Sequence, residues 1–148
     1  MPLMFDDRGL LVPGTHDATL AEVEQAFARF QRSDRRVTLF VKLKAYLSEV
    51  RQTGWQCEVF LDGSFVMPMV DEPNDIDVIL VMQDDFRPEI CPAESLALFD
   101  HGRAGAELGA SIFWVRPGML LGEPLEEFLA HWEQKRDGRR RGIVEIRP

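Results

Sequence analysis

Apolar and polar positions recur along the chain with two different periods, and these periods predict its elements. After a lead-in at residues 1–18, expected to be extended, apolar side chains recur every three or four positions to about residue 31. This spacing is typical of one face of a helix. Thr19 and Glu22 stand at its start as a capping box, in which each side chain accepts a hydrogen bond from the other residue's backbone N–H.

A second helix is predicted to begin at Ser33 or Asp34 and to end at Thr53-Gly54. Its expected buried stripe comprises Val37, Phe40, Val41, Lys44, Leu47 and Val50. Shorter apolar runs then predict strands at residues 55–61, 75–82, 111–115 and 143–146. Helical spacing returns at residues 93–101 and 123–136.

This order of elements predicts an α/β or α+β fold, with a mixed β-sheet flanked by helices. The 148 residues are expected to form a single domain, 1–148, since a chain of this length can bury a core without disulfides. The fractions of apolar residues (45%) and charged residues (28%) are those of ordinary globular proteins.

The cysteines and the N-terminus indicate a compartment. Cys57 and Cys91 stand alone, without the paired spacing of a zinc site, which favours a reducing environment. The first residues are acidic where a secretion signal would be basic, and no apolar run approaches the roughly 20 residues of a membrane span. We therefore expect a cytoplasmic protein without membrane contact.

The net charge of −8 makes nucleic acid an unlikely partner, because broad binding of nucleic acid depends on neutralising phosphates. Two basic clusters stand against this balance. They comprise Arg29, Arg32, Arg35, Arg36, Lys42 and Lys44 in one segment, and Lys135, Arg136, Arg139, Arg140 and Arg141 in another. Each cluster can be a solvated surface or can face a polyphosphate or an acidic partner.

The central segment carries the chemistry. A strand ends in Gly63-Ser64, and ten residues later Asp75 and Asp77 begin the next strand at alternate positions. Alternate side chains of a strand share a face, so both carboxylates are expected to point the same way. Such a pair beside a glycine turn indicates a divalent-metal site next to a phosphate cradle. In the competing interpretation Asp75 caps a turn after Pro73-Asn74, and Asp62-Gly63 only forms a turn.

Gly63-Ser64, ten residues and then Asp75-Ile76-Asp77 resemble the GS-x10-DxD signature of minimal nucleotidyltransferases in the DNA polymerase β-like superfamily. Three segments, LLVPGTHDATLAEVEQAF, DGSFVMPMVDEPNDIDVILV and HWEQKRDGRRRGIVEI, are similar to a small bacterial nucleotidyltransferase-like family. This resemblance extends over nearly the whole chain.

The resemblance implies a role for each matched residue. Gly63 would let the nucleotide approach the backbone, and Ser64 would hold its phosphates. Asp75 and Asp77 would be the catalytic residues, binding Mg²⁺ or Mn²⁺ on a nucleoside triphosphate, with ATP the expected substrate. By analogy with antitoxins of this superfamily that adenylylate a partner toxin, the acceptor would be a protein side chain. The chain is short for the extra domains that bind tRNA or a DNA template, which favours a protein or a small molecule as acceptor.

The chain departs from the family pattern at the third carboxylate, which active members carry on a later strand. The strand at 111–115 has no acid, and Ser111 stands roughly where the aspartate is expected. The nearest acids are Glu107 and Glu123, while Glu58 and Asp62 share strand parity and could reach the cleft. Two functions therefore stay open: an active nucleotidyltransferase, or an inactive member of that fold that binds a nucleotide or a partner.

Overall fold

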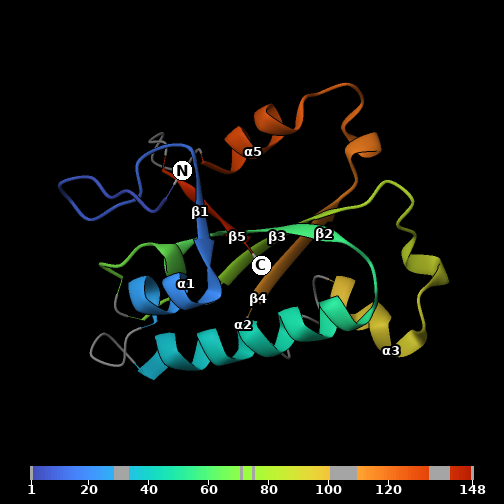
Figure 1. Cartoon of the computed structure of the whole chain (residues 1–148), viewed down its shortest axis with the longest axis horizontal. Helices are drawn as coiled ribbons and strands as arrows, with labels where there is room; N and C mark the ends of the chain where they lie inside the picture. The colour runs from blue at the N-terminus through green and yellow to red at the C-terminus, as the bar shows by residue number, and fades with distance from the viewer. Residues whose placement is uncertain are drawn as a thin grey trace.

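One mixed sheet organises the chain. The computed structural model describes residues 2–28, 34–70, 72–74, 76–100, 110–133 and 141–147. Within them five strands lie in the order β1–β5–β2–β3–β4 (Figure 1). The strands are β1 (Thr15–Thr19), β2 (Cys57–Asp62), β3 (Ile76–Met82), β4 (Ala110–Val115) and β5 (Ile143–Arg147). β2 is antiparallel to both neighbours, whereas the β1–β5 and β3–β4 pairs are parallel.

The helices cover the two faces of this sheet unequally. The helices are α1 (Leu20–Phe27), α2 (Asp34–Gln52) and α3 (Ala93–Leu96) on one face, and α5 (Leu125–Glu133) on the other (Figure 1). Leu61 and Val78 pack in the larger core under α1 and α2. Phe60 and Ile79, one position along, pack with Leu129 of α5. The expected α+β fold, a mixed sheet flanked by helices, is confirmed.

Most predicted elements are confirmed with small shifts at their ends. The capping box forms, with Glu22 N–H donating to Thr19 Oγ1 at 3.2 Å and Thr19 N–H donating to Glu22 Oε1 at 3.0 Å. The four predicted strands correspond to β2, β3, β4 and β5, and α5 begins two residues later than expected. Among the described helices, none has both the length and the apolar character needed to cross a membrane.

Two helices are shorter than predicted, and side chains of α2 bond backbone carbonyls at or just beyond their ends. α1 ends at Phe27 rather than near residue 31, and the Phe27 carbonyl accepts a hydrogen bond from Arg36 Nη1 at 2.9 Å. α3 is followed by a short 3-10 turn at Ala97–Phe99, where Tyr46 of α2 donates its hydroxyl hydrogen to the Leu98 carbonyl at 2.6 Å.

The predicted stripe of α2 is partly wrong. Val41 is 60% exposed and Lys44 is exposed. The residues that α2 buries are instead Arg36, Leu39, Phe40, Leu43, Tyr46, Leu47 and Val50. This set also follows helical spacing, and it begins with a charged residue, which an apolar pattern does not include.

The lead-in is also more structured than expected. Its last residues form β1, which pairs in parallel with β5, so that Thr15 lies opposite Ile143. Before β1, Phe5 and Leu11 form an isolated antiparallel bridge. His16 of β1 is fully buried, and its Nε2 lies 2.7 Å from the Val12 carbonyl oxygen.

Candidate functional site

Asp62 and Asp77 face each other across the β2–β3 pair. They are the last opposed residues of the pair, where β2 ends and β3 begins. Directly opposed residues of antiparallel strands have Cβ atoms about 4.5–5.5 Å apart. Asp62 is only 3% exposed, although an aspartate is rarely so buried. The strands thus hold two carboxylates close together on the side of the sheet that α5 partly covers.

Ser111 continues this row on the next strand. It lies in parallel register with Asp77, on the same face of the sheet. Both side chains are half-buried. The position where the resemblance expects a third carboxylate thus carries a hydroxyl. Asp75 and Glu107 lie outside the described residues.

Gly63 brings the turn after β2 against the carboxylate of Asp77. A Cβ built on Gly63 would lie 2.8 Å from Asp77 Oδ2. Its φ of +85° is also a conformation that residues with a side chain rarely adopt. Ser64 follows directly and begins a short 3-10 turn, Ser64–Val66. Gly63 therefore lies against Asp77, and Ser64 is the next residue along the chain.

Arg36 holds the segment that follows Ser64 in place. Its side chain reaches from α2 into the core, where it is fully buried. Its guanidinium donates to the carbonyls of Phe65 at 2.7 Å, Met67 at 2.7 Å and Val70 at 2.6 Å. A further contact of the guanidinium, to the Ser64 carbonyl, is longer at 3.4 Å. Because guanidinium donors have a fixed fork geometry, these contacts fix the shape of the turn.

Arg35 fixes the other end of the same connection. Its Nε donates to the Pro73 carbonyl at 3.1 Å, and its Nη2 donates to the Asn74 carbonyl. The two adjacent arginines at the start of α2 therefore hold both ends of the connection between Ser64 and the acidic strand. The surface interpretation of this basic cluster is wrong for Arg36, which no solvent reaches.

More carboxylates lie on the same face along β5 and β1. Glu145 is 9% exposed, and its Oε1 lies 3.4 Å from Nη2 of Arg147, which also bonds Asp17 at 3.0 Å. Burial raises the pKa of Glu145 above its ordinary value of 4.5. The guanidinium of Arg147 lowers this pKa, while the neighbouring carboxyl of Glu58 raises it further. Glu145 thus holds a proton more tightly than a solvated carboxyl does.

The residues of the row fit a magnesium ion. Mg²⁺ prefers oxygen ligands and is commonly bound by one or two carboxylates together with substrate phosphates. Asp62 and Asp77 supply two such groups, held opposite each other on neighbouring strands. Within the described part of the chain, however, no group of three or more His, Cys, Asp or Glu side chains converges on one point.

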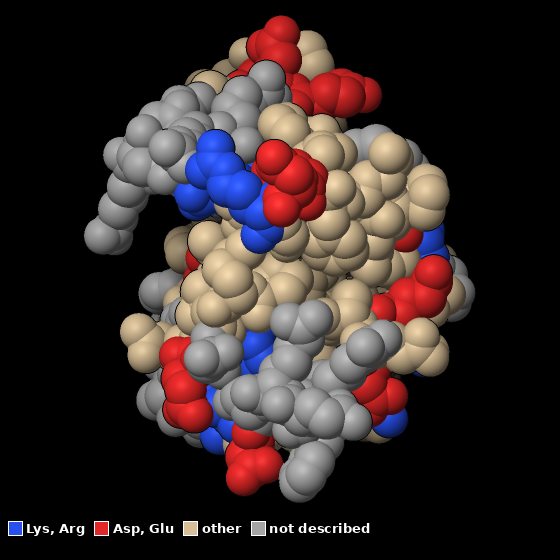
Figure 2. Space-filling model, turned by 90° about the vertical axis from the view of Figure 1, so that its left-hand side faces the viewer, with Lys and Arg blue, Asp and Glu red and all other residues tan. Residues whose placement is uncertain are grey.

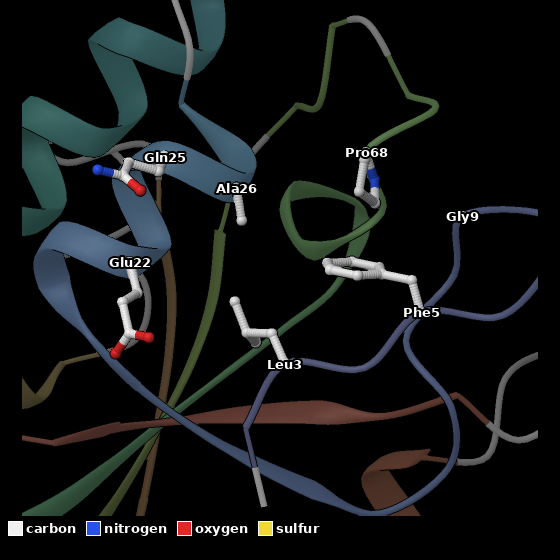
Figure 3. Close-up of a pocket in the computed structure, with 7 residues that line it drawn as sticks. All are labelled: Leu3, Phe5, Gly9, Glu22, Gln25, Ala26 and Pro68. Atoms are coloured by element: carbon white, nitrogen blue, oxygen red, sulfur yellow. The ribbon is translucent and has the colours of Figure 1, made fainter.

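A separate cavity of about 440 Å³ lies between α1, the N-terminal segment and Pro68 (Figure 3). Phe5 and Leu3 point into it from one side, and Gln25 and Ala26 line it from α1 (Figure 3). On this side of the molecule uncharged residues form a broad area between charged groups (Figure 2). Among the described lining residues the charged one is Glu22, so the cavity does not suit a phosphate.

Comparison with known proteins gives a family without an activity. Residues 3–147 match a family described as a family of unknown function, DUF6932, and the chain belongs to this family. No curated protein and no solved structure matches the chain. A proposal about function must therefore come from the residues of the site.

The sequence did not predict where two residues of this region, Asp62 and Arg36, lie. The sequence shows that Asp62 and Phe60 lie on the same face of their strand. The position of Asp62 opposite Asp77, however, depends on the register of the hairpin. Arg36 stands three and four residues before the buried Leu39 and Phe40. That helical spacing is the signal that would have placed it on the buried side of α2.

Proposed function

We propose that this protein is a Mg²⁺-dependent nucleotidyltransferase, in which Mn²⁺ can replace Mg²⁺. It transfers NMP from a nucleoside triphosphate, ATP, to a hydroxyl group of a protein or of a small molecule. The observation that carries the proposal is the opposition of Asp62 and Asp77 beside the positive-φ turn at Gly63. Two carboxylates held together next to a positive-φ glycine turn are suited to a metal-bound triphosphate.

Each residue of the candidate site has a role in this proposal. Asp77, with Asp75 before it, supplies carboxylates to the metal. Gly63, which has no Cβ, lets the turn lie against the carboxylate of Asp77, where its backbone would meet a metal-bound phosphate, and Ser64 donates its hydroxyl hydrogen to a phosphate oxygen. Mg²⁺ bound by these carboxylates would offset the negative charge of the phosphates. The role of the protein is positioning and charge stabilisation rather than covalent catalysis.

The transfer itself exchanges one phosphorus–oxygen bond for another. The acceptor oxygen bonds to the α-phosphorus, the bond from that phosphorus to the bridging oxygen of the β-phosphate breaks, and pyrophosphate leaves. The acceptor hydroxyl gives up a proton in this step. We assign the proton to the carboxylate of Asp62, because Asp62 lies opposite Asp77 and thereby supplies, from β2, the acid that β4 lacks at Ser111.

The second candidate function is binding without turnover. Ser111 favours it, since a serine neither offsets the charge of a metal ion nor accepts a proton readily. In that case the site holds a nucleotide or a partner protein and the transfer step is lost. Losing a general base is typically worth 10²–10⁴-fold in rate.

A protein acceptor would make this chain an antitoxin-like modifier of a toxin-like partner. We place the protein in the cytoplasm, where ATP is available. Its two cysteines, Cys57 and Cys91, are both free thiols, as a reducing compartment favours.

Transfer of label from α-³²P-ATP tests the proposal. The protein is incubated with Mg²⁺ or Mn²⁺ and with the product of the adjacent gene, and labelled protein is measured. We expect label on the partner with the wild type, and a loss of about 10²-fold or more with Asp62→Asn. Saturable Mg²⁺–ATP binding without any transfer would favour the second function. If the protein neither bound Mg²⁺–ATP nor transferred label, both the transferase and a nucleotide-binding role would be excluded.

A further inference from the structure

A second and larger cavity, of about 780 Å³, lies on the face of the sheet opposite to Asp62, Asp77 and Ser111. Pockets that hold small molecules commonly have 300–1,000 Å³. Val59 of β2 lines the cavity, and Val59 alternates with Phe60 and Asp62 toward opposite faces. The cavity is therefore separate from the row of Asp62, Asp77 and Ser111. It opens where β1, β2 and β5 meet the start of α1 and the end of α2.

The interior of this cavity is apolar. Leu47 and Val50 of α2 form its buried wall. Other apolar side chains that line it are half-buried rather than covered, namely Leu20, Trp55, Cys57, Val59 and Ile146. These five side chains belong to the edge of the larger core, so the cavity is a place where the helical layer leaves the sheet open. Filling it would remove apolar surface from water.

The charges around the cavity have one sign. Its described lining residues include Arg51 and Arg147 and no acid, in a chain with a net charge of −8. Arg147 already bonds Asp17 and Glu145 on the other face of the sheet. Arg51, exposed on the last turn of α2, has no side-chain ion pair or hydrogen bond among the described residues. One cation therefore remains available at the rim of an apolar space.

We propose that this cavity binds an amphiphilic organic anion, with its apolar body against Leu47, Val59 and Ile146 and its carboxylate at Arg51. The mouth is open beside Gly54, where an added Cβ would meet no atom within 4 Å. An apolar body matches the walls, and a single negative charge matches the rim. A neutral chain of the same length loses the contact with Arg51, and a short anion such as acetate loses the apolar contacts.

Decanoate and decanol, both below their aggregation limits, are the probes that test this proposal. Titration calorimetry of the full chain is expected to give one decanoate site, with a Kd about tenfold below that of decanol. Arg51→Gln should make the two affinities equal, whereas Lys44→Gln removes an exposed charge from the same helix outside the cavity and should preserve the difference. Ala21→Phe, which adds a ring at the exposed edge of the cavity, should weaken both ligands.

The thiol of Cys57 reports the place of binding. In a Cys91→Ser background, decanoate should slow maleimide labelling of Cys57 at least fivefold, and acetate should not. Equal affinities of the wild type for decanoate and decanol, or unchanged labelling of Cys57 in the presence of bound decanoate, would overturn the proposal. A dimer that dissociates on Ala21→Phe would instead place a second copy in the cavity and would also overturn it. Melting curves of each variant confirm that it is folded.

Discussion

Ser111 on β4 lies in register with Asp77 on β3, one strand apart on the same face of the sheet. A side chain at this position is thus a direct neighbour of Asp77, since adjacent strands lie about 4.8 Å apart. An acid here would complete a row of three carboxylates with Asp62, whereas the serine leaves two. The identity of one residue therefore decides how much negative charge this edge of the sheet presents to a metal.

Ser111→Asp places a carboxylate where the nucleotidyltransferases that the sequence resembles carry one. Without a metal, the added charge beside Asp77 should lower the melting temperature by a few degrees, because like charges on adjacent strands repel. Mg²⁺ should reverse this loss and bind more tightly than to the wild type. Transfer activity should rise by up to about 10²-fold. Ser111→Asn has a similar size without the charge and serves as the control. Equal Mg²⁺ affinities of the two variants would contradict this prediction.

Gly63→Ala tests the close approach of the turn to Asp77. The new Cβ would lie 2.8 Å from Asp77 Oδ2, so the carboxylate must move. Gly122→Ala is a matched control, because Gly122 has a similar φ of +90° but nothing within 4 Å of an added Cβ. Both variants should lose about 1–2 kcal/mol from backbone strain.

Gly63→Ala alone should lose a further ~1 kcal/mol or more and should also lose Mg²⁺-dependent binding of ATP. Urea unfolding and calorimetry measure the two effects. If the two alanine variants were equally stable and both bound ATP, the contact between Gly63 and Asp77 would have no role in the site.

Arg36→Met tests whether the buried guanidinium holds the turn after Ser64. Methionine fills similar space but leaves the carbonyls of Phe65, Met67 and Val70 without their donor. Since each unsatisfied buried group costs about 1–3 kcal/mol, the variant should lose at least about 3 kcal/mol. Arg36→Lys should recover only part of this lost stability, because an ammonium group cannot reproduce the fork of donors of a guanidinium.

Lys42→Met, on the same helix, is the control for losing a positive charge, and it should change the free energy of unfolding by less than about 0.5 kcal/mol. Urea denaturation measures all three variants. A loss for Arg36→Met no larger than that for Lys42→Met would show that the turn keeps its shape without Arg36.

Glu145 should make stability fall as pH rises. Its pKa is raised in the folded protein, mainly by burial, so the folded state holds the proton more tightly than the unfolded state. The free energy of unfolding therefore decreases as the pH rises from about 4.5, the ordinary pKa of a glutamate, to the raised pKa of Glu145 in the folded protein. Above that pKa the loss of stability persists. Glu145→Gln cannot ionise, so it should flatten this part of the curve. Glu24→Gln, at an exposed position on α1, should leave the pH dependence of stability unchanged. Urea denaturation from pH 4 to 8 measures the free energy of unfolding of all three proteins. A curve for Glu145→Gln with the wild-type slope would refute the assignment.

Local patterns in the sequence predicted the elements near the site but not their pairing. The run that ends in Gly63-Ser64 and the run that follows Asp75 have strand composition and clear breakers, so both strands were predictable. The opposition of Asp62 and Asp77 was not, because a long connection does not fix the register of a hairpin. β1 was missed for a related reason. Its partner β5 is more than 100 residues away, and THDAT has little apolar character of its own.

Buried polar residues account for the remaining errors. Tyr46 and Arg36 belong to the buried side of α2 because distant carbonyls accept their hydrogen bonds, at Leu98 and at the turn after Ser64. A pattern based on apolar residues favours Val41 instead, which is exposed. Such partners come from other segments of the chain, so spacing within one helix cannot identify them.

The most direct test of the proposed function is the melting temperature with Mg²⁺ and ATP in the wild type and in Asp77→Asn. Ligand at about 100 times its Kd adds about 2.7 kcal/mol to the free energy of unfolding, which for a chain of this length raises the melting temperature by about 5–10 °C. We predict this rise for the wild type only when Mg²⁺ is present, and its absence in an otherwise folded Asp77→Asn. A wild type that shows no rise, or an equal rise in Asp77→Asn, would contradict a metal–nucleotide site at Asp77.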